Sequence, residues 1–387
     1  MTIAYASPNR SHHFRYAEGL EAEGLLKWFV QGYPRFRRAP LAVDSRRVMH
    51  RDFLQTLFVP AFRVLNEHPF TERLNLASKN SIDRGLCRAM KEAQVGLFYN
   101  GCGLHSLRHW SGSGKVFVCE AVNCHLDAQS EWLREECQLL GLPFREPYEP
   151  EREKRLAEYA EADYILCPSQ FVARSFVSKG IAAERLLVNP FGIAPAPALL
   201  RPGSGKGSDD SFTVLYVGSI NYRKGLRYLI EAFDRLRVPG KLLRIVGPRL
   251  EPDGISDLHL PDGVRFDGVL RGEALTQAYL QADVFVQPSI EEGLSLVIGE
   301  AMGHGLPVIA TNHTGVDELF ADGECGFHVP IRDSQSLLDR LTRIAENDSL
   351  RQQFAEAGLA KSRKFSGWAA SQHSLCALLQ KLQPSLS

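Results

Sequence analysis

The chain has 387 residues, of which 44% are hydrophobic, and this length suits two α/β domains, each with its own core, better than one. Lysine plus arginine number 45, as do aspartate plus glutamate, so the net charge of zero excludes the overall basic field of a typical nucleic-acid-binding protein. An anionic ligand must therefore be held by local charge.

Cysteine spacing and hydropathy favour a water-soluble protein with reduced thiols. The eight cysteines form no Cys-x-x-Cys pair, and several lie in apolar runs where a thiol packs as a small hydrophobic group. A zinc site of Cys119, Cys124, His125 and Cys137 would have to join a strand, a loop and a helix, and we do not favour it. No apolar run approaches a membrane span and no signal peptide precedes the first strand-like residues. We therefore expect a cytoplasmic protein, at most peripheral at the inner face of the membrane.

The first 26 residues carry strand, loop and helix signals in turn. Residues 2–6 predict a strand and residues 14–26 a helix, which together are typical of the opening of a Rossmann-like unit. Arg10, His12 and His13 lie in the loop between them. Their side chains can extend into a ligand cleft, although adjacent loop histidines are most often solvated, and both interpretations stay open.

Residues 27–51 interleave aromatic and basic side chains. The aromatic ones are Trp28, Phe29, Tyr33 and Phe36, and the basic ones are Lys27, Arg35, Arg37, Arg38, Arg46, Arg47 and Arg51. Such a segment can contact an anionic membrane surface or the phosphates of a substrate. A solvated loop with aromatic residues in the core explains it as well, and we favour that interpretation.

Two further strands of the first half end in polar segments. Residues 95–99 predict a strand that ends in a turn containing Asn100 and Gly101, which we expect to line a cleft. Residues 116–120 predict the next strand, followed by a loop bearing His125 and by an amphipathic helix through Leu140.

One eight-residue pattern occurs in each half of the chain. Residues 162–169 and 282–289 both read Ala-Asp, four strand residues, Pro-Ser, which indicates weak internal symmetry and two related doubly wound domains. Between them, residues 194–211 are rich in proline, glycine and serine and have no hydrophobic period, as expected of a domain linker.

The second half opens with a strand predicted at residues 212–217 and a helix at residues 226–236. Gly218 ends the strand, and Arg223 and Lys224 precede the helix, an arrangement that favours the approach of a phosphate group. Two further strand ends are indicated by Gly247 after residues 242–246, and by Gly268 and Val269 after residues 264–266.

The turn at residues 288–293 joins a buried strand to a helix predicted at residues 294–302, and such turns lie where open α/β sheets bind ligands. Gly293 would let a ligand approach the backbone, and the amides of Leu294 and Ser295 at the helix start would bind a phosphate. Glu292 and Glu300 lie about two helical turns apart, so their carboxylates can bind hydroxyls on both sides of a diphosphate. A pair of solvated helix charges is the alternative.

These residues resemble the signature of the family 4 glycosyltransferases, retaining enzymes of the GT-B fold, in which two Rossmann-like doubly wound domains face each other across a cleft. The matching positions, in order and spacing, are Pro288, Ser289, Glu292, Gly293, Glu300, Ala301, Met302, Gly305, Pro307 and Val308. The resemblance covers residues 212–382 specifically and the first half loosely.

The resemblance implies roles for individual residues. Glu300 would bind the ribose of a nucleoside diphosphate sugar, Glu292 its sugar, and Lys224 with Arg223 its diphosphate. Donor contacts would also come from Gly218, Ser219, Gly247, Gly268, Val269, Gly293, Leu294 and Ser295. His125, Glu292 and Lys224 would be the catalytic residues, with His125 near the transferred sugar, and Arg10, His12, His13, Asn100 and Gly101 would lie on the acceptor side.

The sequence departs from the family pattern at three points. Ser219 stands where the family has an arginine, so one cation is missing unless Arg223 replaces it. Ser295 replaces the commoner glycine but keeps the amide and adds a hydroxyl. The first loop lacks the paired glycines that often approach donor and acceptor.

We therefore expect a retaining glycosyltransferase that moves a hexose-type sugar from a nucleoside diphosphate sugar to an acceptor that is a glycan, a lipid or a small molecule. Its domains would be residues 1–195 on the acceptor side, residues 196–365 binding the donor, and residues 366–387 returning to the first domain. A sugar-nucleotide epimerase of the same architecture and a non-catalytic sugar- or nucleotide-binding subunit are the alternatives.

No cofactor or divalent metal is expected. The Asp-x-Asp triplet that commonly holds a metal in metal-dependent transferases does not occur in the sequence. The helix start after Gly293 would contribute about half a positive charge and Arg223 with Lys224 two more, which offsets a departing diphosphate.

Overall fold

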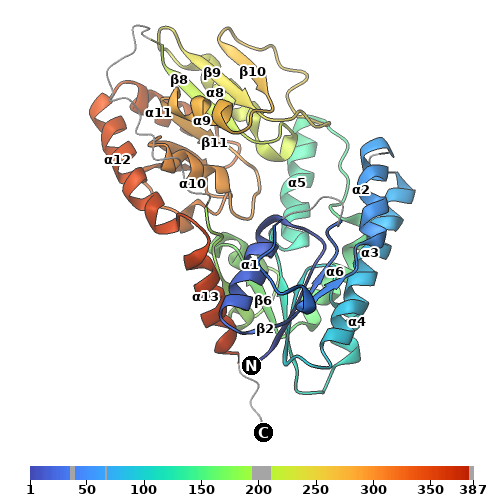
Figure 1. The fold of residues 1–387 in the computed structure, drawn as a ribbon. Helices are drawn as coiled ribbons and strands as arrows, with labels where there is room; N and C mark the ends of the chain where they lie inside the picture. Colours follow the sequence, from blue (N-terminus) through green and yellow to red (C-terminus); the bar gives the residue numbers. More distant parts are fainter. Residues whose placement is uncertain (35–39, 66–67, 194–210, 383–387) are drawn as a thin grey trace.

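The computed structural model describes residues 1–34, 40–65, 68–193 and 211–382, and the two sheets in it are each built of parallel strands (Figure 1). The predicted linker, residues 194–211, and Arg35, Phe36, Arg37 and Arg38 of the basic segment fall outside the described residues, except for Ser211.

The amino-terminal sheet has the order β3-β2-β1-β4-β5-β6-β7. Its strands are β1 (Ile3–Ser7), β2 (Leu26–Gln31), β3 (Val48–His50), β4 (Val95–Tyr99), β5 (Val116–Glu120), β6 (Tyr164–Cys167) and β7 (Leu186–Val188). The helices are α1 (Ser11–Ala22), α2 (Phe53–Leu65), α3 (Pro69–Ala89), α4 (Leu104–His109), α5 (Leu126–Leu140), α6 (Arg152–Glu161) and α7 (Gln170–Val177). The predicted strands at 95–99 and 116–120 are confirmed.

The first predicted helix was wrong at both ends. It begins at Ser11, so His12 and His13 lie in its first turn and not in a loop, and it ends at Ala22. Gly24 follows with a left-handed φ of 67°, which turns the chain so that buried Leu26 starts β2 beside β1.

The basic segment of residues 27–51 mostly belongs to this sheet. Phe29 is fully buried in β2, which supports the favoured interpretation of core aromatics. Among the described cations, Lys27 pairs with Glu92 at 3.0 Å and Arg47 with Glu21 at 3.0 Å, so their charges are met by carboxylates of the same chain.

The carboxyl-terminal sheet has the order β10-β9-β8-β11-β12-β13. Its strands are β8 (Thr213–Val217), β9 (Leu242–Val246), β10 (Val264–Gly268), β11 (Val284–Gln287), β12 (Val308–Thr311) and β13 (Gly326–Val329). The helices are α8 (Leu226–Arg235), α9 (Glu273–Leu280), α10 (Leu296–Gly303), α11 (Ser334–Ala345) and α12 (Asp348–Phe365), with short 3-10 turns η5 (Tyr222–Lys224) and η6 (Val316–Glu318). Both sheets reverse strand order beside their first strand, as predicted for doubly wound domains.

The repeated Ala-Asp-Pro-Ser pattern does not mark equivalent strands. The first copy forms β6, near the edge of its sheet, whereas the second forms β11, next to the central β8. What the copies share is local chemistry: Asp163 accepts a hydrogen bond from the amide of Phe117 at 2.7 Å, and Asp283 one from the amide of Thr213 at 2.8 Å. Each aspartate thus fixes the start of a neighbouring strand.

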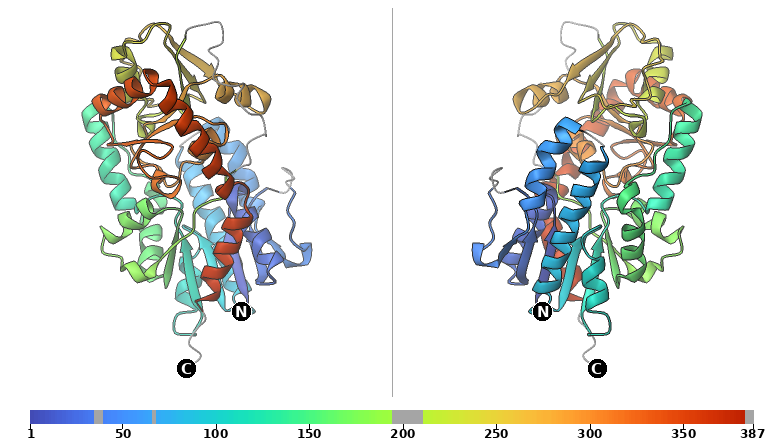
Figure 2. Two further views of the ribbon diagram at one scale, coloured as in Figure 1. Left: turned by 90° about the vertical axis from the view of Figure 1, so that its left-hand side faces the viewer. Right: turned by 90° about the vertical axis from the view of Figure 1, so that its right-hand side faces the viewer.

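The last helix, α13 (Ala369–Gln380), leaves the second domain and packs against α1 of the first (Figure 2). Asn189 lies between them, where its side-chain amide donates to the hydroxyl of Tyr16 at 2.9 Å and to the carbonyl of Ser371 at 3.2 Å. Ile193 joins the same crossing through backbone bonds with Phe365 and Gly367. The described end of the chain therefore holds the two domains together.

Candidate active site

The carboxyl ends of β8 and β11 bring Lys224 and Glu292 together. Gly225 has a left-handed φ of 62°, and a Cβ at this position would lie 2.1 Å from the carbonyl oxygen of Pro288. Only glycine therefore lets η5 approach the turn after β11, where the amide of Ile290 donates to the carbonyl of Arg223 at 2.9 Å. As a result Lys224 Nζ lies 2.9 Å from Glu292 Oε1.

Glu292 is held in place by several donors. Its second oxygen, Oε2, accepts from Gln287 Nε2 at 3.1 Å and from the Ser289 hydroxyl at 3.2 Å. Although burial raises the pKa of Glu292, the charge and hydrogen bond of Lys224 bring the net pKa below its ordinary value. The side chain keeps 20% of its surface exposed, so an ionised carboxylate faces the cleft.

Glu300 lies on α10 and is positioned by a stacked pair of rings. The Tyr279 hydroxyl donates to Glu300 Oε2 at 3.1 Å, and the Tyr279 ring stacks on His304 with centroids 4.7 Å apart. Burial raises the pKa of Glu300 above its ordinary value. Tyr279 comes from α9, so nothing in the sequence near residue 300 indicates this contact.

The predicted glycine strand ends lie at one edge of the second sheet. The Gly218 amide donates to the Val246 carbonyl at 2.9 Å, and the Gly247 amide donates to the Gly268 carbonyl at 2.8 Å. A Cβ at Gly247 would lie 1.8 Å from the Gly218 carbonyl oxygen, so this glycine is required by the packing of neighbouring loops. Gly268 has open space around it, and Val269 is 54% exposed. The Ser219 hydroxyl accepts from Asn221 at 3.2 Å.

Arg223 does not supply the free cation expected from the sequence. Its guanidinium lies 2.8 Å from Glu291 Oε2 and also donates to Asn123 Oδ1 at 3.2 Å. Glu291 is fully buried and also accepts from Gln129 at 2.7 Å and from the Cys124 amide at 3.3 Å. Both site cations therefore face carboxylates, and the sequence-based charge sum was too positive.

Sequence reasoning missed Glu291, although it stands next to Glu292. The only signal is the Glu-Glu doublet, which gives no hint that the two carboxylates point to different domains. Glu291 reaches across to Cys124 and Gln129 at the start of α5, whereas Glu292 stays with Lys224 and β11.

The turn around Gly293 is pressed against the first domain and not open to a ligand. A Cβ at Gly293 would lie 2.0 Å from the carbonyl oxygen of Val122, and the Gly293 carbonyl accepts from the Ser169 hydroxyl at 2.6 Å. The Ser295 amide, predicted to be free, donates to the Thr314 carbonyl at 3.0 Å. Leu294 is 7% exposed and packs in the core. Close interdomain packing is thus what requires a glycine here.

His125 caps a helix. Its Nδ1 accepts from the Asp127 amide at 3.2 Å at the start of α5, and its ring packs near Tyr159 and Phe176, with centroids 5.3 and 5.2 Å away. Burial lowers its pKa, which keeps the ring neutral. This environment accounts for the residue structurally, in contrast to the catalytic role that the resemblance implies.

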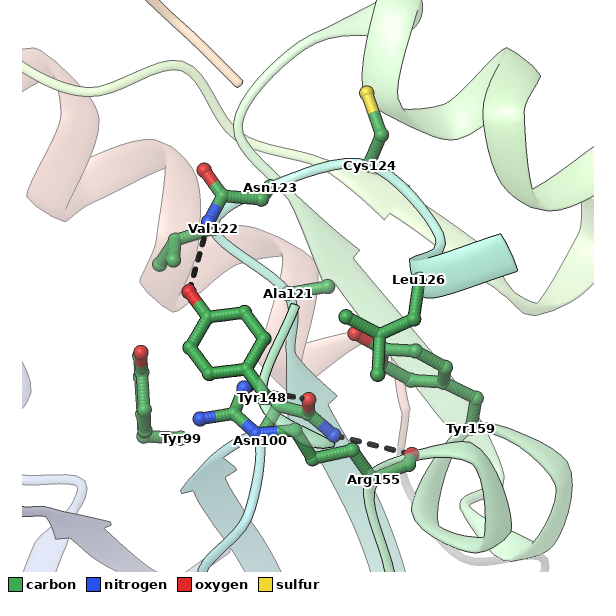
Figure 3. A pocket seen from close by; sticks show the side chains of 10 residues that line it. All are labelled: Tyr99, Asn100, Ala121, Val122, Asn123, Cys124, Leu126, Tyr148, Arg155 and Tyr159. Atoms are coloured by element: carbon green, nitrogen blue, oxygen red, sulfur yellow. Dashed lines mark hydrogen bonds between the residues drawn. The ribbon is translucent and has the colours of Figure 1, made fainter. Parts of the chain in front are cut away.

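Asn100 and Gly101 follow β4, and Asn100 lines a narrow pocket on the first domain (Figure 3). The Asn100 side chain accepts from Arg155 Nη1 at 3.0 Å and donates to Glu158 at 3.0 Å. Gly101 has a φ of 99°, and its amide donates to Glu158. Arg10, in contrast, is exposed at the start of α1 and makes no side-chain cap there.

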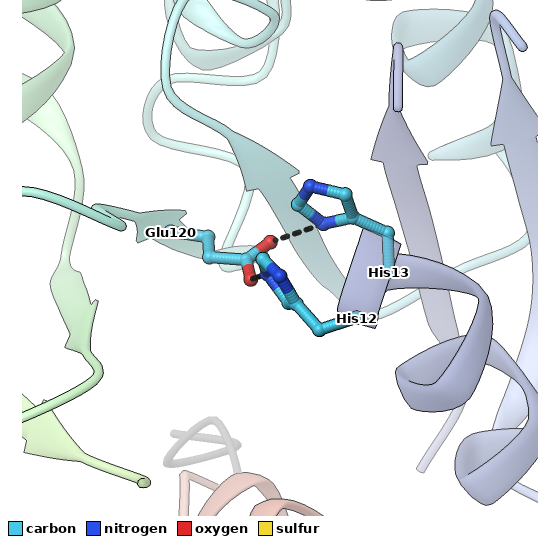
Figure 4. Close-up of side chains that lie close together, drawn as sticks. All are labelled: His12, His13 and Glu120. Carbon is cyan, nitrogen blue, oxygen red and sulfur yellow. Dashed lines mark hydrogen bonds and ion pairs between the residues drawn. The ribbon is translucent and has the colours of Figure 1, made fainter. Parts of the chain in front are cut away.

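His12 and His13 are buried beside Glu120 and not solvated (Figure 4). His12 Nε2 lies 2.5 Å from Glu120 Oε1, and His13 Nδ1 lies 3.2 Å from Oε2, which also accepts from the Tyr5 hydroxyl at 2.8 Å. One ligand atom from each of His12, His13 and Glu120 lies within 4.8 Å of the others, a spacing that a metal ion can bridge. Since both oxygens of Glu120 already accept hydrogen bonds, the two histidines and the carboxylate form a hydrogen-bonded polar network without a metal.

The alternative zinc site of the sequence involved three cysteines. Each of them is a buried free thiol.

Residues 203–361 match the family model of glycosyl transferases group 1. Among curated relatives, a sulfoquinovosyl transferase of Arabidopsis thaliana is 28% identical over 220 residues, which are 54% of this chain and 43% of that protein. A lipopolysaccharide core biosynthesis glycosyltransferase of Rhizobium meliloti is 33% identical over 210 residues, which are 53% of this chain and 60% of that protein. The chain thus spans about half the length of these relatives.

The fold matches solved structures along almost its full length. HepE of Anabaena, in complex with UDP, superposes with a TM-score of 0.67 at 16% identity over 99% of this chain and 100% of that chain. A further structure of HepE contains UDP-glucose and gives a TM-score of 0.64. With two Rossmann-like domains the chain has the GT-B fold, and its residues 203–361 are similar to the glycosyl transferases of group 1.

Proposed function

We propose that the protein is a retaining glycosyltransferase that moves a hexose-type sugar from a nucleoside diphosphate sugar to a hydroxyl of a glycan, a lipid or a small molecule. The observation that carries the proposal is the partly buried pair of Lys224 and Glu292 at 2.9 Å, at the edge of the second sheet, with Glu300 on the following helix. A cation, a sugar-binding carboxylate and a ribose-binding carboxylate are the groups that such a donor requires.

In this proposal the donor rearranges an existing ion pair. Lys224 turns from Glu292 to the diphosphate, which frees the Glu292 carboxylate to accept hydrogen bonds from the sugar hydroxyls. The bond between C1 of the sugar and the phosphate oxygen breaks, and its electron pair stays on the phosphate, where Lys224 stabilises the charge. The acceptor oxygen bonds to C1 on the same face, and its proton passes to the departing phosphate.

Two sets of relatives support this donor class. HepE, which shares the fold, has been solved with UDP and with UDP-glucose. The sequence relatives include a phosphatidyl-myo-inositol mannosyltransferase of Mycobacterium leprae and a putative colanic acid biosynthesis glycosyltransferase of Salmonella typhimurium, so they too are named for the transfer of sugars.

The decisive experiment measures release of free nucleotide from candidate nucleotide sugars, with and without a cell extract as the source of acceptor. A transferase releases nucleotide faster when the acceptor is present, and Glu292→Gln should abolish that increase. Isomerisation or hydrolysis of the donor at a rate independent of extract would favour the epimerase. Nucleotide binding without any conversion would favour the non-catalytic subunit.

The cellular site of action stays a prediction. No helix within the described residues is both long and apolar enough to cross a bilayer. Cytoplasmic action is part of the proposal, and vesicle sedimentation with and without anionic lipid tests the alternative interpretation of residues 27–51 as a peripheral membrane contact.

A further inference from the structure

The first domain contains a buried cation that the proposed transfer of sugar does not use. It lines the narrow pocket of Figure 3, at the carboxyl ends of β4 and β5, together with Tyr99, Asn100, Asn123 and Tyr148. The interior of this pocket has a volume of only about 10 Å³, room for about one water molecule, so a ligand can place no more than a single small atom inside it. The cation is Arg155, on α6.

Arg155 has one nitrogen without a partner. Its Nε donates to Glu151 at 3.1 Å and its Nη1 to Asn100 at 3.0 Å, but Nη2 is buried and makes no hydrogen bond. The residue is 3% exposed, so the unpaired guanidinium N–H has lost its hydration without gaining a protein acceptor. A buried donor of this kind, in the wall of a pocket, points to an acceptor atom supplied by a ligand.

The charges around Arg155 leave the pocket wall positive. Lys79, which is 5% exposed, lies 2.5 Å from Glu151 Oε2, so Glu151 is shared by two cations. Burial and the neighbouring Arg155 lower the pKa of Lys79 to about 8. The nearby Glu158 lies behind Asn100 and accepts hydrogen bonds from backbone amides of the turn after β4, and burial raises its pKa to about 7. Of these groups only Arg155 lines the pocket, and Lys79 and Glu151 lie behind it, so the three together carry one positive charge in excess. Lys154, Asp83 and Glu158 lie next to them, and the excess is greatest while Glu158 is protonated.

Tyr148 closes one side of the pocket in a strained conformation. Its φ is 57°, in the left-handed region that a bulky residue rarely adopts. In this conformation its ring lies 3.9 Å from the guanidinium carbon of Arg155, a cation–π contact. Strain of this kind persists where the surroundings hold it and is concentrated at ligand sites. Here it places an aromatic wall against the cation.

The pocket is connected to the donor-side turn. Asn123 donates to the Tyr148 hydroxyl at 3.3 Å and accepts from Arg223 at 3.2 Å, and Arg223 adjoins Glu291. A group held by Arg155 would thus lie on the wall that faces the donor across the interdomain boundary. That is the position of an acceptor substrate in the proposed function.

We propose that Arg155, with Lys79 beside it, binds an oxyanion of the acceptor, so that the acceptor of this enzyme is a phosphorylated or carboxylated molecule. The identification of the bound anion as part of the acceptor rests on the proposed function, whereas the anion site itself does not. Nη2 supplies the hydrogen bond, the excess charge of the pocket supplies the attraction, and the narrow interior admits only a terminal oxygen of the anion.

The test measures binding of inorganic phosphate and of acetate by titration calorimetry, with the protein saturated with UDP so that the donor site is filled. At least one anion should bind to the wild type, and Arg155→Met should weaken it at least tenfold. The matched control is Arg152→Met, which removes an arginine one turn earlier on the same helix, where it pairs with Asp127, and should leave anion affinity within about twofold.

Anion binding that survives in Arg155→Met, or is absent from the wild type, would overturn the proposal. If Arg155→Met fails to fold, wild-type crystals soaked in selenate decide: an anomalous peak within hydrogen-bond distance of Arg155 Nη2 supports the site, and peaks only elsewhere refute it. The two hypotheses fail separately. A wild type that binds phosphate through Arg155 but converts no nucleotide sugar would contradict the proposed function alone.

Discussion

Gly293 is the position at which the sequence and the structure give different reasons for the same residue. From the sequence we explained the glycine by the close approach of a phosphate. In the structure the backbone of Val122 occupies the space that a side chain of residue 293 would need. The substitution Gly293→Ala separates the two explanations. The added Cβ would lie 2.0 Å from the Val122 carbonyl oxygen and 3.0 Å from its carbon, and real Cβ atoms essentially never come within 3.0 Å of another heavy atom.

The clash must be relieved by moving backbone, because neither partner is a flexible side chain. The separation has to grow from 2.0 to at least 3.0 Å, a shift of about 1 Å that strains the neighbouring bond from Ser169 to the Gly293 carbonyl. Overpacking of this size costs about 1–3 kcal/mol. In differential scanning calorimetry we expect a melting temperature lower by several degrees, while UDP affinity changes less than about twofold.

The matched control is Gly358→Ala. Gly358 lies within α12, and a Cβ there would have its nearest neighbours at 3.7 Å, an ordinary contact. Alanine favours a helix by about 0.5–1 kcal/mol over glycine, so this variant should melt at the wild-type temperature or slightly above. A Gly293→Ala variant that melts like the wild type but binds UDP poorly would refute the interdomain explanation and restore the ligand one.

Four further predictions follow from the site. Lys224→Ala and Glu300→Ala should each weaken binding of the donor nucleotide by about 1.5–3 kcal/mol in calorimetry, and unchanged affinity in both would contradict the donor assignment. His125→Ala should lower the stability to urea by about 0.5–2 kcal/mol with turnover preserved, because its ring caps α5, whereas a large loss of turnover at normal stability would return it to catalysis. We propose that transfer needs no divalent metal, so activity should persist in excess EDTA, and activity lost with the chelator and restored by magnesium or manganese would contradict this. Burial, together with the neighbouring His13, lowers the pKa of His12 from 6.5 to about 4, so the unfolded chain binds a proton that the folded protein excludes. Resistance to urea should therefore fall as the pH is lowered from 6.5 to 4, and less steeply in His12→Gln.

The metal prediction now rests on different charges from those read in the sequence. Arg223 and Lys224 are paired with Glu291 and Glu292, so they do not form a free double positive charge. Compensation of the diphosphate requires Lys224 to leave Glu292 when the donor arrives. The EDTA experiment thus tests whether Lys224, once released from Glu292, and the surrounding backbone amides are sufficient to stabilise the departing diphosphate without a metal.

The sequence by itself determined the elements whose signals are local. The strand at 242–246 is found at its predicted bounds, and the helix predicted at 226–236 ends at Arg235. Strand order beside the first strand of each sheet, and hence the cleft edge, followed from alternating strands and helices. The spacing of Glu292 and Glu300 predicted two carboxylates in one strand-to-helix unit, and they lie there because sequence distance fixes spatial distance within such a unit.

Only the tertiary structure decided contacts between residues far apart in the chain. Glu291 binds Gln129, His12 binds Glu120, and Arg155 is left with one open donor beside Lys79. Sequence periodicity carries no information about such pairs, since each depends on how segments far apart in the chain pack, within the first domain for His12 and Arg155 and between the domains for Glu291. For the same reason the sequence shows that residue 293 is a glycine but not why. The reason is the backbone of Val122 in the first domain, which leaves no room for a Cβ.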